Sequence, residues 1–144
     1  MTASGNLLWD LVRTAHLAER RLTAIMADAG LTPAQFGVLS CIADGDDLSQ
    51  ADLAKAIMVR PQSMGRLVTD MVAAGLVERN GAGGRGRRAG LRMTPAAAAA
   101  LDRARPAVMR TAQPDQLGLT GADHSSLTAL LDDLRQRLQD DEAR

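Results

Sequence analysis

The segment from residue 49 to residue 75 constrains the fold most, because capping signals divide it into two short helices. Ser49-Gln50-Ala51-Asp52 is typical of a helix N-terminus, and Arg60-Pro61 opens the second helix. That second helix is polar at its start, and its apolar stripe consists of Met64, Leu67, Val68, Met71 and Val72. Two short helices with a tight connection, the second of them amphipathic, indicate a helix-turn-helix.

A β-hairpin is predicted directly after this pair of helices. Residues 76–79 and 91–93 are typical of two short strands, and the segment NGAGGRGRR between them, at 80–88, is too rich in glycine to pack. Its arginines make the turn region cationic. We therefore expect a hairpin with a long, mobile, positively charged tip.

Longer helices are predicted on both sides of this segment. Residues 4–29 carry a heptad-like apolar seam, and Thr32-Pro33-Ala34-Gln35 has the form of a capping box. Another helix is expected from Thr94-Pro95, with Pro106 kinking or breaking it because proline lacks the N–H donor. The last helix repeats leucine at alternating spacings of four and three residues, at Leu127, Leu131, Leu134 and Leu138.

The composition favours a mainly helical fold and disfavours several other classes. The chain has 144 residues, 46% of them apolar, but only one Phe, one Trp and no Tyr, which disfavours an all-β fold. No apolar run approaches the roughly 18 residues of a membrane span, and no secretion signal opens the sequence. A single cysteine fits a reducing compartment. We expect a cytoplasmic, mainly α protein with a small β-hairpin and no membrane contact.

Positive charge is concentrated in the middle of a chain whose formal net charge is zero. Residues 60–92 carry seven arginines against Asp70 and Glu78, a local net charge of +5, while both ends of the chain are acidic. A basic block between acidic ends predicts a surface that faces a polyanion. Because the block includes the helix-turn-helix, double-stranded DNA is the expected partner.

Candidate DNA contacts gather on the two short helices and in the hairpin tip. Gln62 and Ser63, followed one turn later by Arg66, place polar donors where base edges would lie. The other candidates suit phosphates or a narrow minor groove. For Gln62 and Ser63 the alternative role is helix capping alone. For the arginines the alternative is a solvated charge with no DNA contact. The full set is Ser49, Gln50, Arg60, Gln62, Ser63, Arg66, Arg85, Arg87 and Arg88.

The segment RPQSMGRLVTDMVAAGLVER, followed by GRGRRAGLRMTP, resembles the MarR family of bacterial winged-helix transcription regulators. The resemblance implies a single domain over residues 1–144. Within it, residues 31–94 would form the winged helix-turn-helix, and residues 4–30 and 95–142 the dimerisation helices. It further implies a homodimeric regulator, a repressor of a pseudo-palindromic operator.

The hairpin tip departs from the family pattern at one position. The family carries Asp-x-Arg before its Leu-Thr-Pro end; here Arg87 occupies the arginine position, whereas Arg85 occupies the aspartate position. We therefore expect the tip to lack its usual internal ion pair. A dimeric protein-interaction module whose winged helix no longer reads a DNA sequence stays open as the alternative function.

The terminal helices exceed what a winged helix needs, which predicts that their spare apolar faces meet the same faces of a second chain. Packing within one chain is the alternative. The resemblance also implies a small aromatic or phenolic effector that binds between the dimerisation helices and the DNA-binding lobe and releases DNA. Its candidate contacts, each with core packing as the alternative, are Trp9, Val12, His16, Met26 and Phe36.

The sequence contains no recognisable catalytic or metal-binding grouping. It lacks a Ser/His/Asp set, a carboxylate pair and a phosphate loop, and two separate histidines with one cysteine do not make a zinc site. Cys41 lies in an apolar helical setting, with no basic residue within one turn in sequence. We expect a protein that is not an enzyme, has no metal or cofactor, and keeps Cys41 buried and inert.

Overall fold

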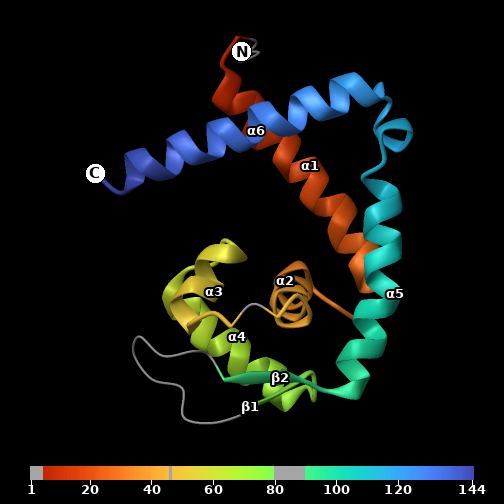
Figure 1. Ribbon diagram of the computed structural model, residues 1–144, viewed down its shortest axis with the longest axis vertical. Helices are drawn as coiled ribbons and strands as arrows, with labels where there is room; N and C mark the ends of the chain where they lie inside the picture. Colours follow the sequence, from red (N-terminus) through yellow and green to blue (C-terminus); the bar gives the residue numbers. More distant parts are fainter. Residues whose placement is uncertain (1–4, 46, 80–89) are drawn as a thin grey trace. The chain divides into compact units, whose positions relative to one another are not determined.

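The computed structural model describes residues 5–45, 47–79 and 90–144. It is mainly α-helical with a two-stranded antiparallel sheet, which confirms the predicted fold class (Figure 1). The chain divides into two compact units, residues 1–108 and 109–144. In the described part of the chain, no helix has the length and apolar character needed to cross a membrane. The elements in chain order are α1 (Leu7–Ala27), α2 (Pro33–Ala43), α3 (Gln50–Ala56), α4 (Pro61–Ala73), β1 (Val77–Arg79), β2 (Leu91–Met93), α5 (Pro95–Thr111), η1 (Pro114–Leu117) and α6 (Gly121–Glu142).

Local capping explains where the first helices begin and end. Thr32 and Gln35 form the predicted capping box: the Thr32 hydroxyl accepts from the Gln35 N–H at 3.2 Å, and the Gln35 side chain accepts from the Thr32 N–H at 3.0 Å. The Asn6 side chain accepts from the Trp9 N–H at 3.2 Å, so α1 begins at Leu7 rather than at residue 4. Gly75 ends α4 with a φ of 72°, a left-handed conformation that glycine adopts without strain.

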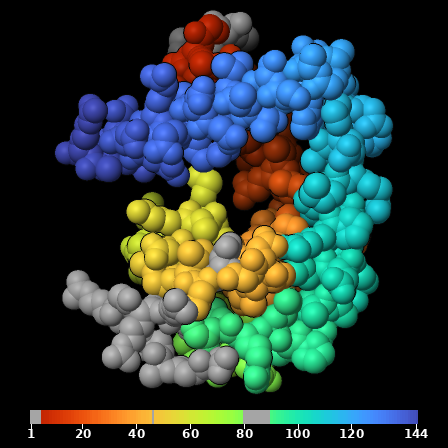
Figure 2. Space-filling view, in the orientation of Figure 1, coloured from red at the N-terminus to blue at the C-terminus, as the bar shows by residue number. Residues whose placement is uncertain are grey.

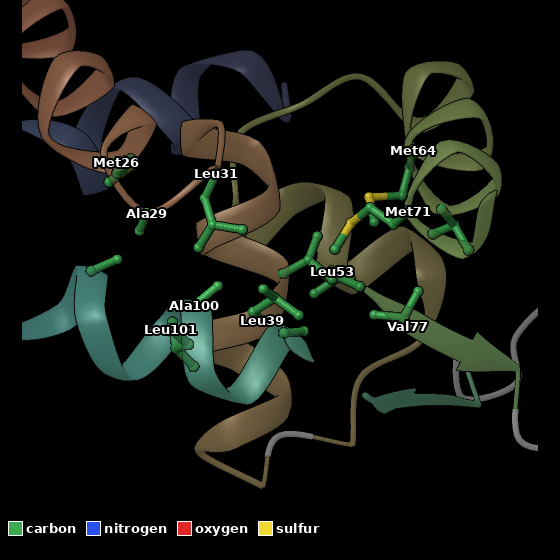
Figure 3. Packing of buried hydrophobic residues seen from close by; sticks show 14 of the residues in the cluster. Met26, Ala29, Leu31, Leu39, Leu53, Met64, Met71, Val77, Ala100 and Leu101 are labelled. Carbon is green, nitrogen blue, oxygen red and sulfur yellow. The ribbon is translucent and has the colours of Figure 1, made fainter. Parts of the chain in front are cut away.

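The core of the first unit receives side chains from α1 to α5 and from β1 (Figure 3). Figure 3 shows Leu39 of α2, Leu53 of α3 and Met71 of α4 meeting in one interior. Each such fully buried apolar side chain stabilises the fold by roughly 1.5–3 kcal/mol relative to its exposed state. This core holds the two short helices and the hairpin together.

The buried stripe of α4 is narrower than the sequence predicted. Met64, Val68 and Met71 are fully buried, but Leu67 is half-buried and Val72 is 39% exposed. The three buried residues follow at spacings of four and three, which places them on one line of the helix, and the other two flank that line.

β1 begins one residue later than predicted, at Val77. The Leu76 N–H donates to the Met71 carbonyl at 2.9 Å, which closes the end of α4. Leu76 therefore belongs to the helix cap. The strands then pair antiparallel, with Val77 opposite Met93 and Arg79 opposite Leu91.

α5 passes through Pro106 without ending there, so the predicted break does not occur. Ala104 is buried and Val108 packs against the core, so tertiary contacts hold the helix on both sides of the proline. Pro106 and Asp102, whose carbonyl loses its helical donor, are both exposed. Water can therefore satisfy that carbonyl, which lowers the cost of the proline.

The second unit contains the end of α5, η1 and α6. Thr120 caps α6: its hydroxyl accepts from the Asp123 N–H at 3.1 Å and donates to the Asp123 carboxylate at 2.7 Å. His124 Nε2 lies 3.1 Å from the Ala112 carbonyl oxygen, which ties the first turn of α6 to the segment before η1. No residue of α6 is buried, and Leu130 is 65% exposed.

Candidate nucleic-acid interface

A tight turn joins α3 to α4 and sets the direction of α4. The Met58 N–H donates to the Lys55 carbonyl at 3.2 Å, and Met58 itself adopts a left-handed φ of 58° where glycine is usual. Gly37 of α2 supports this turn at close range, because a Cβ added there would lie 2.8 Å from Ile57 Cγ2. The start of α4 is therefore braced by α2 as well as by α3.

The polar side chains of α4 lie on the face opposite its core methionines. Gln62, Arg66 and Thr69 follow at spacings of four and three residues, and all are exposed. Arg60 and Ser63 are also exposed at the helix start, where Arg60 makes no side-chain cap. Among these five, only Thr69 makes a side-chain hydrogen bond or ion pair to a described residue. The structure therefore brings four of the predicted contacts together with their donors available.

Ser49 and Gln50 act within the helix pair itself. The Ser49 hydroxyl accepts from the Asp52 N–H at 3.1 Å and donates to the Asp52 carboxylate at 2.7 Å, which caps α3. The Gln50 amide nitrogen lies 3.5 Å from where a Cβ of Gly65 would be, so Gln50 reaches across to α4. Both residues are half-buried, and the segment of α3 appears at the surface in yellow in Figure 2. Their contact with the DNA backbone stays a prediction.

The base of the hairpin carries an exposed ion pair. Glu78 and Arg92 are opposite each other in the strand register, and their side chains approach to 2.7 Å. Exposed cross-strand pairs of this kind stabilise by roughly 0.2–1 kcal/mol. The predicted contacts in the tip, Arg85, Arg87 and Arg88, lie outside the described residues.

Thr94 joins the end of α4, the hairpin and α5. Its hydroxyl donates to the Gly75 carbonyl at 2.6 Å and accepts from the Ala97 N–H at 3.2 Å, while its N–H donates to the Leu76 carbonyl at 3.1 Å. This role of Thr94 is not evident from the sequence, because the bonded carbonyls are remote from it in the chain. The contact fixes the C-terminal end of α4.

Arg105 makes a similar connection between α5 and α2. Its guanidinium donates to the Asp44 carboxylate at 2.8 Å and to the Ser40 carbonyl at 3.3 Å. This link between distant segments was also missed in the sequence. Thr94 and Arg105 therefore connect the start and the middle of α5 to the segments around the helix-turn-helix.

Comparison with known proteins agrees with this arrangement. A model of the MarR family matches residues 29–88. Over 129 residues the chain is 35% identical to a Thauera aromatica protein named as a proposed transcriptional regulatory protein for the hcr operon, covering 89% of this chain and 78% of that one. This chain belongs to the MarR family.

Solved structures of MarR-family and related regulators share the fold. The Mycobacterium tuberculosis regulator MosR is 26% identical, with a TM-score of 0.77 and coverage of 94% of this chain and 97% of MosR. The M. tuberculosis MarR family protein Rv2887, solved with salicylic acid, is 25% identical, with a TM-score of 0.68 and coverage of 93% and 99%. Rv2887 has also been solved with DNA, at a TM-score of 0.69. These matches confirm the winged-helix fold and identify a MarR-family transcriptional regulator.

The predicted effector contacts of this MarR-family chain fall into two groups. Trp9, Val12 and His16 are exposed on the N-terminal half of α1. Met26 belongs to the core, and Phe36 packs against it. At 1.5 Å per residue, Met26 lies about 15 Å along the helix from His16. Contact of any of the five with an effector stays a prediction.

Two further residues differ from what the sequence indicated. Cys41 is half-buried beside the core rather than fully buried, because the helices that pack on α2 cover only part of it. Thr69 was not among the candidate contacts, yet it is exposed on the same face of α4 as Arg66. Its spacing of three residues from Arg66 is the sequence signal that places Thr69 on the same helix face.

Proposed function

We propose that this protein is a homodimeric transcriptional repressor that binds a pseudo-palindromic operator through α4 and the hairpin. The exposed polar face of α4 carries this proposal, since Gln62, Ser63 and Arg66 are held on a braced helix with no described partner. In a major groove, arginine pairs with guanine and glutamine with adenine. The DNA complex of Rv2887 supports this use of the fold.

A second copy of the chain supplies the second half of the DNA-reading surface. Leu8 and Val12 of α1 are 52% and 58% exposed, and Leu127 and Leu130 of α6 are 45% and 65% exposed. Exposed apolar surface of this kind marks interaction sites. In our proposal these helices pair with their copies about a two-fold axis, so that the two α4 helices reach half-sites about one turn of DNA apart.

A small aromatic or phenolic molecule releases the DNA in this proposal, and the protein acts in the cytoplasm. The salicylic acid complex of Rv2887 supports an effector of that chemistry. Such a ligand acts only through different affinities for the DNA-bound and free arrangements of the dimer. Titrating salicylate into a protein–operator complex tests it: DNA release supports the effector, and unchanged affinity for DNA at saturating salicylate contradicts it.

Selection of bound fragments from the source genome, using purified full-length protein, tests the DNA function. We expect an enriched inverted repeat whose two halves are centred about one helical turn apart. A pool without any enriched repeat would contradict the proposal and favour the protein-interaction module.

Arginine variants on different helices refine that test. Arg66→Ala should relax base preference by about 1–3 kcal/mol at one position of each half-site, because a bidentate contact is lost. Arg103→Ala removes the same charge from an exposed site on α5 and should leave base preference unchanged. If Arg66→Ala weakens operator and scrambled DNA equally, Arg66 contacts phosphate and not a base.

A further inference from the structure

Thr69 has its hydroxyl hydrogen committed inside the helix. The Thr69 side chain is exposed, and its Oγ1 donates to the Gly65 carbonyl at 3.0 Å. A hydroxyl has one hydrogen, so this bond leaves none for an external acceptor. Towards a ligand, Thr69 offers an acceptor oxygen and a methyl group, Cγ2, on a side chain whose first torsion is restricted.

The surroundings of Thr69 allow close approach of a ligand. Gly65, one turn before it, has no side chain, and Ala73, one turn after it, is exposed and carries only a methyl group. Gln62, Arg66, Thr69 and Ala73 follow at spacings of four, three and four residues, which places them along one face. Beyond Arg66, that line therefore bears only small side chains, with the exposed Asp70 and Val72 on either side of it.

We infer, on the basis of the proposed function, that Thr69 determines specificity by placing its methyl group against the 5-methyl group of a thymine in each half-site. That methyl is the apolar group on the major-groove edge of the bases, and a threonine methyl is one of its natural contacts. Because its hydroxyl hydrogen is bonded to the Gly65 carbonyl, Thr69 presents its methyl group and an acceptor oxygen to the bases in this geometry. Its preference is for an A·T pair, next to the base that Arg66 reads.

Operator DNA in which deoxyuridine replaces thymidine tests this contact, because only the 5-methyl group is removed. Each thymine is replaced in turn, in both half-sites, and affinity is measured with the full-length protein. Burying one methyl group favours binding by about fourfold, so one symmetric replacement should weaken binding by about 15-fold.

Two variants of Thr69 separate its methyl group from its hydroxyl. Thr69→Val keeps a methyl group and should retain both the affinity and the sensitivity to deoxyuridine. Thr69→Ser keeps the hydroxyl, should bind the unmodified operator about 15-fold more weakly, and should lose nothing further on deoxyuridine DNA. Arg66→Ala is the matched control: it should bind more weakly but keep the sensitivity at the same thymine.

The outcomes distinguish failure of the Thr69 contact from failure of the proposed function. The role of Thr69 is overturned if wild type loses no affinity at any thymine, or if Thr69→Ser stays as sensitive to deoxyuridine as wild type. In either case, specific binding to the selected operator would still support the proposed function. Loss of affinity in Thr69→Val but not in Thr69→Ser would show that the oxygen makes the contact, which also overturns it. A genomic selection that yields no operator overturns both.

Discussion

Met58 shows how one residue sets the direction of α4 at an energetic cost. Its left-handed backbone closes α3, and its side chain is 77% exposed, so it makes little packing contribution in return. A residue with a Cβ costs roughly 1–2 kcal/mol in this region of backbone space, a cost that glycine avoids. The turn therefore holds strain that a substitution can release.

Met58→Gly should raise the free energy of unfolding by about 1 kcal/mol, measured by urea denaturation. Met58→Ala is the control, because it removes the exposed side chain but keeps the Cβ, and it should leave stability nearly unchanged. An equal gain in both variants would mean that the side chain, and not the backbone conformation, is the source of the cost.

Thr94 contributes to stability because its hydroxyl both donates to a remote carbonyl and caps α5. Thr94→Val keeps the shape but loses the bond to the Gly75 carbonyl and the cap on Ala97 N–H. We expect the free energy of unfolding to fall by about 1–2 kcal/mol. Thr23→Val is the control, because among the described residues the exposed Thr23 hydroxyl bonds only to the carbonyl of Glu19 in its own helix. A comparable loss in both variants would refute the special role of Thr94.

At the scale of elements, the structure describes the base of the hairpin, and the sequence between its strands is rich in arginine. The base is held by strand pairing and by Glu78 with Arg92. The segment at 80–88, outside the described residues, carries Arg85 where the family has an aspartate, which is an additional positive charge in the sequence. We expect this change to favour contact with a DNA phosphate.

Arg85→Ala and Arg87→Ala should each lower the slope of log affinity against log salt by about 1, the effect of one lost phosphate contact. A salt titration on the operator measures this slope, with Arg103→Ala as a control that should not change it. An unchanged slope in Arg85→Ala would mean that Arg85 does not meet the DNA backbone.

α1 divides into two functional parts along its length. Leu22 is half-buried and packs against the core, and Met26 is fully part of it, so the C-terminal half supports the DNA-binding fold. Leu8 and Val12 are exposed in the N-terminal half. A substitution that is meant to probe dimerisation belongs in that N-terminal half, because a change at Leu22 would also weaken the core.

At the scale of the whole molecule, the proposed dimer should determine how strongly DNA is held. Leu8→Asp combined with Leu127→Asp places charge on the exposed apolar faces of α1 and α6 and should give a monomer. Loss of the second half-site should then weaken operator binding by about 10²-fold or more. Sedimentation velocity at micromolar concentration measures the assembly, and a titration with operator measures the affinity.

Ala129→Asp provides the matched control for this variant. Ala129 is exposed on α6 two residues from Leu127, which places it on the opposite side of the helix. It should remain a dimer with unchanged affinity. A wild-type protein that sediments as a monomer would contradict the proposed assembly.

The sequence by itself determined the local structure of this protein. Capping at Thr32, Ser49 and Thr120, and the glycine that ends α4, act through bonds within a turn or two, so their residues predict them directly. The exposed polar start of α4 follows from the same helical period that buries its methionines. The two strands of the hairpin also followed from the residues, and the family resemblance implied that this hairpin is the wing of a winged helix.

Only the tertiary structure decided which residues of each apolar stripe are covered and which distant segments are joined. Val72 and Cys41 are more exposed than their apolar settings indicated, because exposure depends on the elements that pack over a face. α5 continues past Pro106 because core contacts hold it on both sides. Thr94 and Arg105 bond to carbonyl and carboxylate groups that lie far away along the chain. Such contacts exist only after the chain has folded, since no spacing in the sequence encodes them.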